Sequence, residues 1–280
     1  MLRALYVDLD GTLLGPGGSL LTSFEGGFSL DAVRALQACE RAGVEVVICS
    51  GRRLSSVAED ARLMGQRSYI FELGCALVLD GELEWLTDGR LPSLEAGTIY
   101  DQITRSGAPA ALLEAFAGRL EYHVPWSAER DVSHLFRGQL DAAAATAVLV
   151  AGGWEWLRLV DNGVMAPEAG WTGFVDYGLD DSVDRVHAYH LVPASGSKAR
   201  AVARHMQNRG YAPEECIGCG DSREDLEMAG IVGTFWMMRN GVERDPTLTA
   251  VLADRAGVRV SAERLGAGVY EAVMTTLADG

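Results

Sequence analysis

Short apolar segments alternate with helical patterns at both ends of this 280-residue chain. In the N-terminal part, residues 4–7, 44–49 and 69–71 are apolar runs of strand length. Helical patterns lie between them, over 31–43 and 54–64. Because neighbouring parallel strands need a long connection, usually a helix, this order predicts a parallel sheet with crossover helices.

The same rhythm returns near the C-terminus after an irregular middle section. The predicted elements there are a helix from Lys198 to Gln207, strands over 215–219, 231–237 and 257–260, a short helix over 225–229 and a last helix over 262–277. The simplest organisation is a discontinuous α/β domain, with an α+β domain inserted into it. We predict that residues 1–80 and 192–280 form a Rossmann-like parallel sheet with helices on both faces, and that residues 81–191 form the insertion.

The charge balance excludes several classes of partner. The chain has 24 Lys and Arg residues against 39 Asp and Glu residues, a formal net charge of −15. Nucleic-acid binding needs a basic surface, and anionic membranes repel an acidic protein. No apolar run reaches the roughly 18 residues of a membrane-spanning helix, and the N-terminus lacks the long apolar stretch of a signal peptide. We therefore expect a cytoplasmic protein that binds neither nucleic acid nor membrane.

The cysteines do not predict a disulfide framework. Five is an odd number, and the chain shows no export signal. Cys216 and Cys219 have the spacing of a redox motif, but they lie in an apolar run that predicts a strand, where positions three apart point to opposite faces. We expect small buried residues at these positions, and a redox or metal pair is the alternative.

Polar side chains follow several of the predicted strands at the point where each strand ends. They are Asp8, Asp10 and Thr12 after the first strand, Ser50, Gly51 and Arg52 after the second, and Asp221, Ser222 and Asp225 after the strand at 215–219. Ligand sites of open parallel sheets form at the carboxyl ends of the strands. We therefore expect these residues to converge on one edge of the sheet.

The run Asp8-Leu9-Asp10-Gly11-Thr12 is the most informative of these segments. The glycine lets the second acid turn toward the first, and two close carboxylates are costly unless a cation lies between them. Mg²⁺ takes a few carboxylates together with waters and substrate phosphate. The segment therefore predicts a Mg²⁺ site, whereas a helix cap or an ordinary loop acid is the alternative reading.

Lys198 is the only lysine beside 23 arginines. Arginine replaces lysine readily on an exposed surface, but it cannot supply a compact, strongly hydrated point charge. Lys198 stands at the predicted start of a helix in the same half of the chain as Asp221 and Asp225. Chance survival of one lysine and a functional requirement for it are the two interpretations.

With Asp8-x-Asp10-Gly11-Thr12, Ser50, Lys198 and Gly220-Asp221-x-x-x-Asp225 in this order, the chain resembles the haloacid-dehalogenase-like (HAD) phosphohydrolase superfamily. It looks most like the Cof-like and sugar-phosphatase branch, class IIB, in which a C2 cap domain lies between the second and third motifs. About 40 residues separate Asp10 from Ser50, which leaves no room for a cap there, whereas 148 positions separate Ser50 from Lys198.

The resemblance implies a two-step phosphoryl transfer. Asp8 would be the nucleophile that forms an aspartyl-phosphate, and Asp10 would protonate the leaving oxygen and then activate water. Lys198 would neutralise the phosphate. The Asp8 carboxylate, the Asp10 backbone carbonyl and Asp221 would hold Mg²⁺, and Asp225 would support the metal site or orient Lys198.

Other residues are expected to contact the substrate or its phosphate. They are Thr12, Ser50, Gly51, Arg52 and Asn240 in the α/β domain and Arg158 in the insertion. Trp154, Trp156 and Arg158 are predicted to share one face of a strand, where they could stack on a sugar or bind a second anionic group. A packed sheet face with a snorkelling arginine is the alternative.

Two positions depart from the pattern of the branch. Asn often precedes the second acid of the fourth motif, where this chain has Glu224. We expect that glutamate to face solvent, and the alternative is that it adds negative charge near the metal. Glu-Asn-Gly-Ala often follows the third strand, where this chain has Glu72-Leu73-Gly74-Cys75. Leu73 removes an amide that could face substrate, so the specificity of any one family member does not transfer to this chain.

The function expected from the sequence is that of a Mg²⁺-dependent phosphomonoesterase. Its substrate would be a small soluble phosphate ester, with a phosphosugar as one candidate, and the enzyme would be a monomer or a homodimer. The alternative is a phosphomutase-like phosphotransferase acting on sugar phosphates. A binding protein without catalysis is a further alternative, although every predicted catalytic position is filled.

Overall fold

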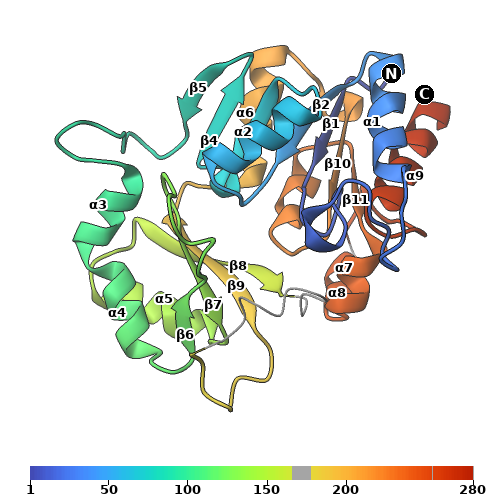
Figure 1. Cartoon of the computed structure of the whole chain (residues 1–280). Coiled ribbons are helices and arrows are strands. Elements are labelled where there is room, and N and C mark those ends of the chain that lie inside the picture. Colours follow the sequence, from blue (N-terminus) through green and yellow to red (C-terminus); the bar gives the residue numbers. More distant parts are fainter. Residues whose placement is uncertain (166–177, 254, 280) are drawn as a thin grey trace. The chain divides into compact units, whose positions relative to one another are not determined.

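The computed structural model describes residues 1–165, 178–253 and 255–279 (Figure 1). The chain divides into two compact units. We call Met1–Glu84 with Ser197–Gly280 the core unit, and Trp85–Gly196 the inserted unit. The boundaries expected from the sequence, 80/81 and 191/192, lie a few residues earlier.

The core unit is built on an eight-stranded sheet in the described part of the chain. In spatial order the strands are β12 (Val258–Val260), β11 (Thr234–Met237), β10 (Cys216–Gly220), β1 (Ala4–Val7), β2 (Glu45–Cys49), β3 (Ser68–Phe71), β4 (Ala76–Leu79) and β5 (Glu82–Trp85). The neighbours from β12 to β3 pair in parallel, and β4 is antiparallel to β3. All four residues of β1 are buried, as expected for a strand covered on both faces.

Helices connect and cover these strands. They are α1 (Asp31–Ala42), α2 (Leu54–Leu63), α6 (Lys198–Arg209), α7 (Arg239–Arg244), α8 (Leu248–Leu252) and α9 (Leu265–Asp279). Short 3₁₀ helices lie at η1 (Pro16–Gly18), η2 (Glu72–Gly74), η3 (Pro213–Glu215) and η4 (Asp225–Gly230). Gly43 and Gly210 end α1 and α6 in the left-handed conformation, as glycine at a helix C-terminus allows.

The order of the core strands contains one reversal that matters for function. The chain runs from β1 outward through β2 and β3, and later places β10 on the other side of β1. At such a switch point the loops that follow the two central strands separate and leave a crevice at their carboxyl ends. Asp8 follows β1 and Asp221 follows β10, so the acidic loops meet at this crevice.

The inserted unit is an α+β arrangement. Its sheet has the order β6 (Leu120–Tyr122), β7 (His134–Gly138), β9 (His187–Pro193) and β8 (Leu157–Val164), and every neighbouring pair is antiparallel. Its helices are α3 (Ile99–Ser106), α4 (Ala108–Ala115) and α5 (Ala142–Ala151). A capping box closes the start of α3, because Thr98 and Asp101 satisfy each other's backbone N–H groups.

The predicted strand face of Trp154, Trp156 and Arg158 is wrong. Only Arg158 lies on β8, because the chain stays in turns until the strand begins at Leu157. The backbone N–H of Trp154 donates to Leu149, and that of Leu157 donates to Trp154. The Trp156 ring instead lies under the guanidinium of Arg90, 3.7 Å from its centroid.

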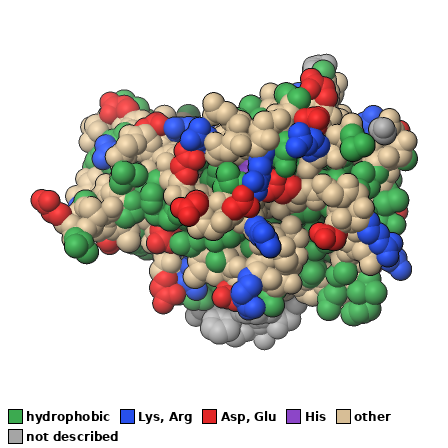
Figure 2. Space-filling view, turned by 90° about the horizontal axis from the view of Figure 1, so that it is seen from above, with side chains coloured by type: hydrophobic (Ala, Val, Ile, Leu, Met, Phe, Trp, Pro, Cys, Tyr) green, Lys and Arg blue, Asp and Glu red, His purple; other side chains and the backbone are tan. Residues whose placement is uncertain are grey.

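The cysteines, the helix lengths and the surface charges bear on expectations that concern the whole chain. All five cysteines are free and buried, which confirms the reading of Cys216 and Cys219 as small buried residues. No helix within the described ranges has the length and hydropathy needed to cross a bilayer. Acidic and basic side chains are interspersed on the face seen in Figure 2.

Candidate active site

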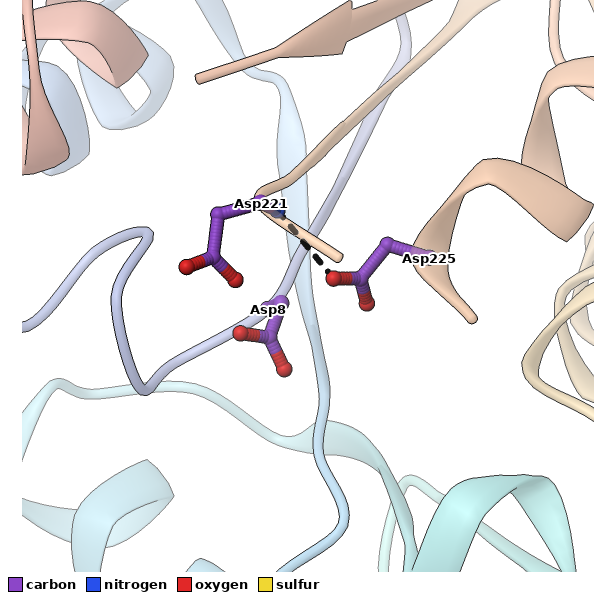
Figure 3. Close-up of side chains that lie close together, drawn as sticks. All are labelled: Asp8, Asp221 and Asp225. Carbon is purple, nitrogen blue, oxygen red and sulfur yellow. Dashed lines mark hydrogen bonds between the residues drawn. The ribbon is translucent and has the colours of Figure 1, made fainter. Parts of the chain in front are cut away.

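Three aspartates come together at the carboxyl end of the central strands (Figure 3). Asp8, Asp221 and Asp225 each place one carboxylate oxygen within 4.8 Å of the others, and all three are buried. The backbone fixes this approach, because the N–H of Asp8 donates to the carbonyl of Cys219 on the neighbouring strand. The sequence predicts these three residues at one edge of the sheet, and the structure brings them together there.

Lys198 lies inside this acidic cluster. Lys198 is the first residue of α6, and only 1% of Lys198 is exposed. The N-cap of this helix is Ser197, whose side chain accepts a hydrogen bond from the backbone N–H of Arg200. Lys198 Nζ donates to Asp8 Oδ1 at 2.8 Å and to Asp225 Oδ1 at 2.5 Å. Burial by itself lowers the pKa of Lys198, but the surrounding carboxylates outweigh burial and raise that pKa well above its ordinary value.

Asp225 organises the loop around it. Its Oδ2 accepts from the backbone N–H groups of Asp221 and Ser222 and from the Ser222 hydroxyl, while its Oδ1 accepts from Lys198. The sequence left two roles open for Asp225, metal support and the orientation of Lys198. These contacts are those of a residue that orients Lys198 and the Asp221 loop.

Asp221 carries a partner that the sequence analysis missed. Arg244, in the last turn of α7, donates from Nη2 to Asp221 Oδ2 at 2.5 Å. Gly11 makes the approach of the first loop possible, because a Cβ there would overlap the Asp221 carboxylate and its φ is +83°. Only glycine adopts that backbone conformation without strain.

The electrostatics of the cluster fit a divalent cation. Burial raises the pKa of Asp8 and of Asp221, although Lys198 and Arg244 act against it. Among the described residues, no hydrogen bond reaches Asp8 Oδ2 or Asp221 Oδ1, so each carboxylate keeps one oxygen for a ligand. Carboxylate oxygens that crowd together in a buried site are the ligands that Mg²⁺ prefers.

The Asp10 side chain lies outside this cluster. It is exposed, and its two oxygens accept from Arg52 Nε at 2.7 Å and Nη2 at 2.5 Å. Arg52 also donates from Nη1 to Asp60 on α2 at 2.8 Å. Arg52 therefore binds both Asp10, the predicted acid–base residue, and Asp60. A contact between Arg52 and substrate stays a prediction.

Three other predicted phosphate-binding residues stand close to Asp10 and Arg52 in the sequence. Ser50 is buried after β2, and its Oγ accepts from the backbone N–H of Arg52 at 3.1 Å, with Gly51 between them. Thr12 is wholly buried, and its Oγ1 has no hydrogen-bond partner among the residues that the structure describes. A phosphate contact from any of these residues stays a prediction.

Asn240 connects three segments through its amide. Its Nδ2 donates to the carbonyl of Gly11 at 2.7 Å, and its Oδ1 accepts from the backbone N–H of Leu265 at 3.0 Å. Both polar atoms are therefore engaged with backbone. Asn240 therefore holds the loop that carries Asp10, and its predicted contact with the substrate or its phosphate stays a prediction.

Arg158 belongs to the inserted unit, where it is the second residue of strand β8. Its Nη2 donates to the carbonyl of Gly196 at 2.6 Å. The chain re-enters the core unit directly after Gly196. A role of Arg158 in substrate binding stays a prediction.

Glu224 does not face solvent as predicted. Its side chain is completely buried, and its Oε2 lies 3.0 Å from Lys198 Nζ as an ion pair. Burial raises its pKa to about 7. The expectation is wrong because η4 is a tight 3₁₀ turn that packs against α6, so the residue before Asp225 points inward with it.

The second departure, Leu73, is also buried. Glu72, Leu73 and Gly74 have φ values of 45°, 59° and 81°, a run in the left-handed region. The backbone N–H of Leu73 donates to the carbonyl of Ser50, and a Cβ at Gly74 would overlap the carbonyl of Ser197. This turn therefore joins the Ser50 loop to the start of the Lys198 helix.

Two residues of the site carried no clear signal in the sequence. Arg244 and Asp60 lie in helices among many other charged residues, and nothing in their spacing marks them as partners of Asp221 and Arg52. Ser222 was expected at this edge of the sheet, but the hydrogen bond from its hydroxyl to Asp225 was not predicted.

Comparison with known proteins identifies the family of this chain. A family model described as haloacid dehalogenase-like hydrolase matches residues 5–115 and 183–246. These two segments make up more than half of the chain and contain Asp8, Ser50, Lys198, Asp221 and Asp225.

Curated relatives match along nearly the whole chain. A phosphoglycolate phosphatase of Pyrobaculum neutrophilum is 28% identical over 278 residues, which cover 99% of this chain and 97% of the relative. A phosphoglycolate phosphatase of Methanoculleus marisnigri is 26% identical over 281 residues, with 98% and 96% covered.

Solved structures share the fold. The sucrose-phosphatase of Synechocystis sp. PCC6803 superposes with a TM-score of 0.66 at 13% identity, and 99% of this chain and 98% of that chain are covered. A Thermoplasma acidophilum protein superposes with a TM-score of 0.63 at 17% identity, with 99% of both chains covered. This chain therefore belongs to the haloacid dehalogenase-like hydrolase family, in which it stands with the phosphatases.

Proposed function

We propose that this chain is a Mg²⁺-dependent phosphomonoesterase that acts through an aspartyl-phosphate on Asp8. The observation that carries the proposal is the position of Lys198, whose ammonium lies between Asp8 and Asp225 inside a cluster of buried aspartates. A buried cation among carboxylates suits a reaction in which a carboxylate must approach a phosphate dianion. Phosphoryl transfer depends mostly on positioning and charge stabilisation.

Asp8 and Asp221 are the residues that would hold Mg²⁺, since each keeps one carboxylate oxygen that no described hydrogen bond uses. When bound, the ion would supply charge neutralisation for the phosphoryl oxygens. The formal charges support this assignment, because among the described residues only Lys198 and Arg244 form ion pairs with Asp8, Asp221, Glu224 and Asp225. Asp225 would contribute by fixing Asp221 and Lys198 in place.

In the first step, an oxygen of Asp8 attacks phosphorus, and the bond from phosphorus to the leaving oxygen breaks. Lys198 lowers the repulsion between the Asp8 carboxylate and the incoming anion, as its hydrogen bond to Oδ1 allows. Asp10 gives a proton to the leaving oxygen. In the second step, Asp10 takes a proton from the water that attacks phosphorus, and the bond between Asp8 and phosphorus breaks.

The exposed position of Asp10 supports this role, because its carboxyl group is accessible to the leaving oxygen and to the attacking water. Arg52 and Asp60 would hold it in orientation, with Arg52 bound to both. The proposed substrate is a small soluble phosphate ester. Phosphoglycolate is the first candidate, since the curated relatives that span nearly the whole chain are named for that activity.

The test is a screen for phosphate release with and without Mg²⁺. The panel contains 2-phosphoglycolate, several hexose phosphates, sucrose 6-phosphate and an aryl phosphate. We expect Mg²⁺-dependent release of inorganic phosphate from at least one small ester, and loss of that activity when the metal is chelated. No release from any ester in the presence of Mg²⁺ would contradict the proposal.

The same reactions distinguish the phosphotransferase alternative. A phosphomutase-like enzyme would return the phosphoryl group to the sugar and accumulate an isomerised sugar phosphate. Analysis of the hexose phosphate products alongside the phosphate assay separates the two outcomes. We expect free phosphate and dephosphorylated product in equal amounts, and isomerised sugar phosphate without free phosphate would favour the alternative.

A further inference from the structure

Glu224 is a residue of the site to which the two-step reaction assigns no part. It is completely buried and lies 3.0 Å from Lys198 Nζ. No other described residue donates a hydrogen bond to its carboxylate oxygens. A buried carboxylate whose one partner is shared with two other acids is costly, so a glutamate at this position needs a reason beyond packing.

The contacts of Lys198 suggest that reason. An ammonium group has three N–H donors. Two of them donate to Asp8 Oδ1 and Asp225 Oδ1, at 2.8 and 2.5 Å. Glu224 faces the same ammonium as an ion pair, with its Oε2 3.0 Å from Nζ. A phosphate oxygen that approaches Lys198 can therefore take one donor, and it meets Glu224 as a competing anion.

We propose that Glu224 competes with phosphate for Lys198 and thereby weakens the binding of phosphate esters and of the inorganic phosphate product. This inference rests on the proposed function and assigns a positioning residue to the same site. Two anions that share one buried cation repel each other more strongly than they would in water. Weak binding of the product speeds its release, which is the slow step in many enzymes.

A structural role for Glu224 predicts the opposite result. If the glutamate only held Lys198 in place, its removal would loosen the ammonium and weaken phosphate binding. If it competes with phosphate, its neutral isostere strengthens phosphate binding. The variant Glu224→Gln keeps the shape and removes the charge, so the sign of the change in phosphate affinity separates the two roles.

The single lysine of the chain makes a direct binding measurement possible. With lysine labelled at Nζ with ¹⁵N, the spectrum contains one side-chain resonance, that of Lys198. Titration of inorganic phosphate at saturating Mg²⁺ then gives a dissociation constant for the wild type and for Glu224→Gln. Glu40→Gln is the matched control, since it removes the same charge from an exposed position on α1.

We expect Glu224→Gln to bind inorganic phosphate about tenfold more tightly than the wild type, and Glu40→Gln to match the wild type. In the enzyme assay, KM and the inhibition constant of phosphate should fall together in Glu224→Gln, while kcat changes less. An unchanged or weaker phosphate affinity in a folded Glu224→Gln would overturn the proposal.

Two further measurements keep the inference testable. If Glu224→Gln fails to fold, Glu224→Asn removes the same charge with a smaller amide and must show the same tightening. In the wild type, a Lys198 resonance that does not move on addition of phosphate would also overturn the proposal. Because the binding measurement needs no turnover, a wild type without phosphatase activity would count against the proposed function alone.

Discussion

Lys198 in the core unit and His134 in the inserted unit are both almost completely buried, but their surroundings differ. Lys198 is surrounded by three carboxylates and stays charged. His134 stacks on Tyr100 with ring centroids 3.8 Å apart and shares a hydrogen bond of 2.9 Å with Tyr122. Burial lowers the pKa of His134 to about 4, so the ring is neutral near pH 7.

This difference separates two uses of buried polar groups. Burying charges is expensive even when they are paired, and breaking one pair leaves an uncompensated charge. The core unit retains such charges at the carboxyl ends of its strands, where the proposed chemistry needs them. At His134, by contrast, the inserted unit buries a neutral ring that adds packing and hydrogen bonds. Substitutions in the first group should therefore change activity most, and those in the second should change stability.

Asp8→Asn should have the largest effect. The variant keeps the size of the side chain but removes the nucleophile, so turnover should fall at least about 1000-fold. Steady-state phosphate release measures the loss, and circular dichroism checks that the fold is retained. Activity of Asp8→Asn close to that of the wild type would remove Asp8 from the mechanism.

Lys198→Arg should come next. The pocket holds a compact ammonium with carboxylate oxygens at 2.5, 2.8 and 3.0 Å, and a planar guanidinium is too large for it. We expect kcat/KM to fall about 100-fold. Arg41→Lys, at the exposed end of α1, is the control for an exchange of the two cations. Equal activity in Lys198→Arg and Arg41→Lys would mean that the single lysine of the chain has no functional requirement behind it.

Gly11→Ala should have an intermediate effect on both activity and stability. An added Cβ meets the Asp221 carboxylate, and the residue has a φ of +83°. We expect the free energy of unfolding to fall by about 1–3 kcal/mol and the Mg²⁺-dependent activity to fall about tenfold or more. Calorimetry and phosphate release measure the two changes.

Gly65→Ala is the matched control for that variant. Gly65 has a φ of +73°, but a Cβ there meets no atom within 4 Å. It should lose stability through the backbone conformation alone and keep its activity. If Gly11→Ala and Gly65→Ala lose activity to the same small extent, the contact between the first loop and Asp221 is unimportant.

The smallest effect concerns the inserted unit. Because the pKa of folded His134 is about 4 and that of an unfolded histidine is about 6.5, the unfolded chain binds more protons between these values. Stability should therefore fall as the pH drops from about 6.5 toward 4, by roughly 2 kcal/mol for this residue. Hydrogen exchange of strands β6 to β9 at pH 7 and pH 4.5 measures the change.

His134→Phe tests the origin of that pH dependence. The phenyl ring can still stack on Tyr100 but has no proton to gain, so the fall in protection at low pH should become smaller. The loss of the hydrogen bond to Tyr122 lowers stability at both pH values and does not change the slope. A slope identical to that of the wild type would show that His134 does not titrate in this range.

The parts of the fold that follow from local sequence were predictable. The run Ala4–Val7 is apolar throughout because β1 is buried on both faces, and the strand ends where Asp8 begins the acidic loop. Gly43 and Gly210 mark helix ends because they adopt the left-handed conformation. Asp80-Gly81 is a sequence typical of a tight turn, and it connects β4 to β5 with both residues at positive φ.

The parts that depend on long-range packing were not predictable. Glu224 stands next to an acid of the metal-site motif, and a 3₁₀ helix of six residues is too short for its sequence pattern to show which face is buried. Asn240 and Arg244 contact loops more than 20 residues away in the sequence, and Asp60 meets Arg52 only because α2 follows the Ser50 loop closely. The segment from Trp154 to Leu157 forms a turn, although its alternating apolar and polar residues are typical of a strand.

Trapping the phosphoryl group tests the central claim most directly. In Asp10→Asn, an aryl phosphate needs no proton on its leaving group, so the first step proceeds, whereas water is not activated for the second. After acid quenching and peptide mass spectrometry, we predict one phosphoryl group per chain on the peptide that contains Asp8, and none when Asp8→Asn is combined with Asp10→Asn. Release of the aryl group without phosphoryl transfer to Asp8 would contradict the account.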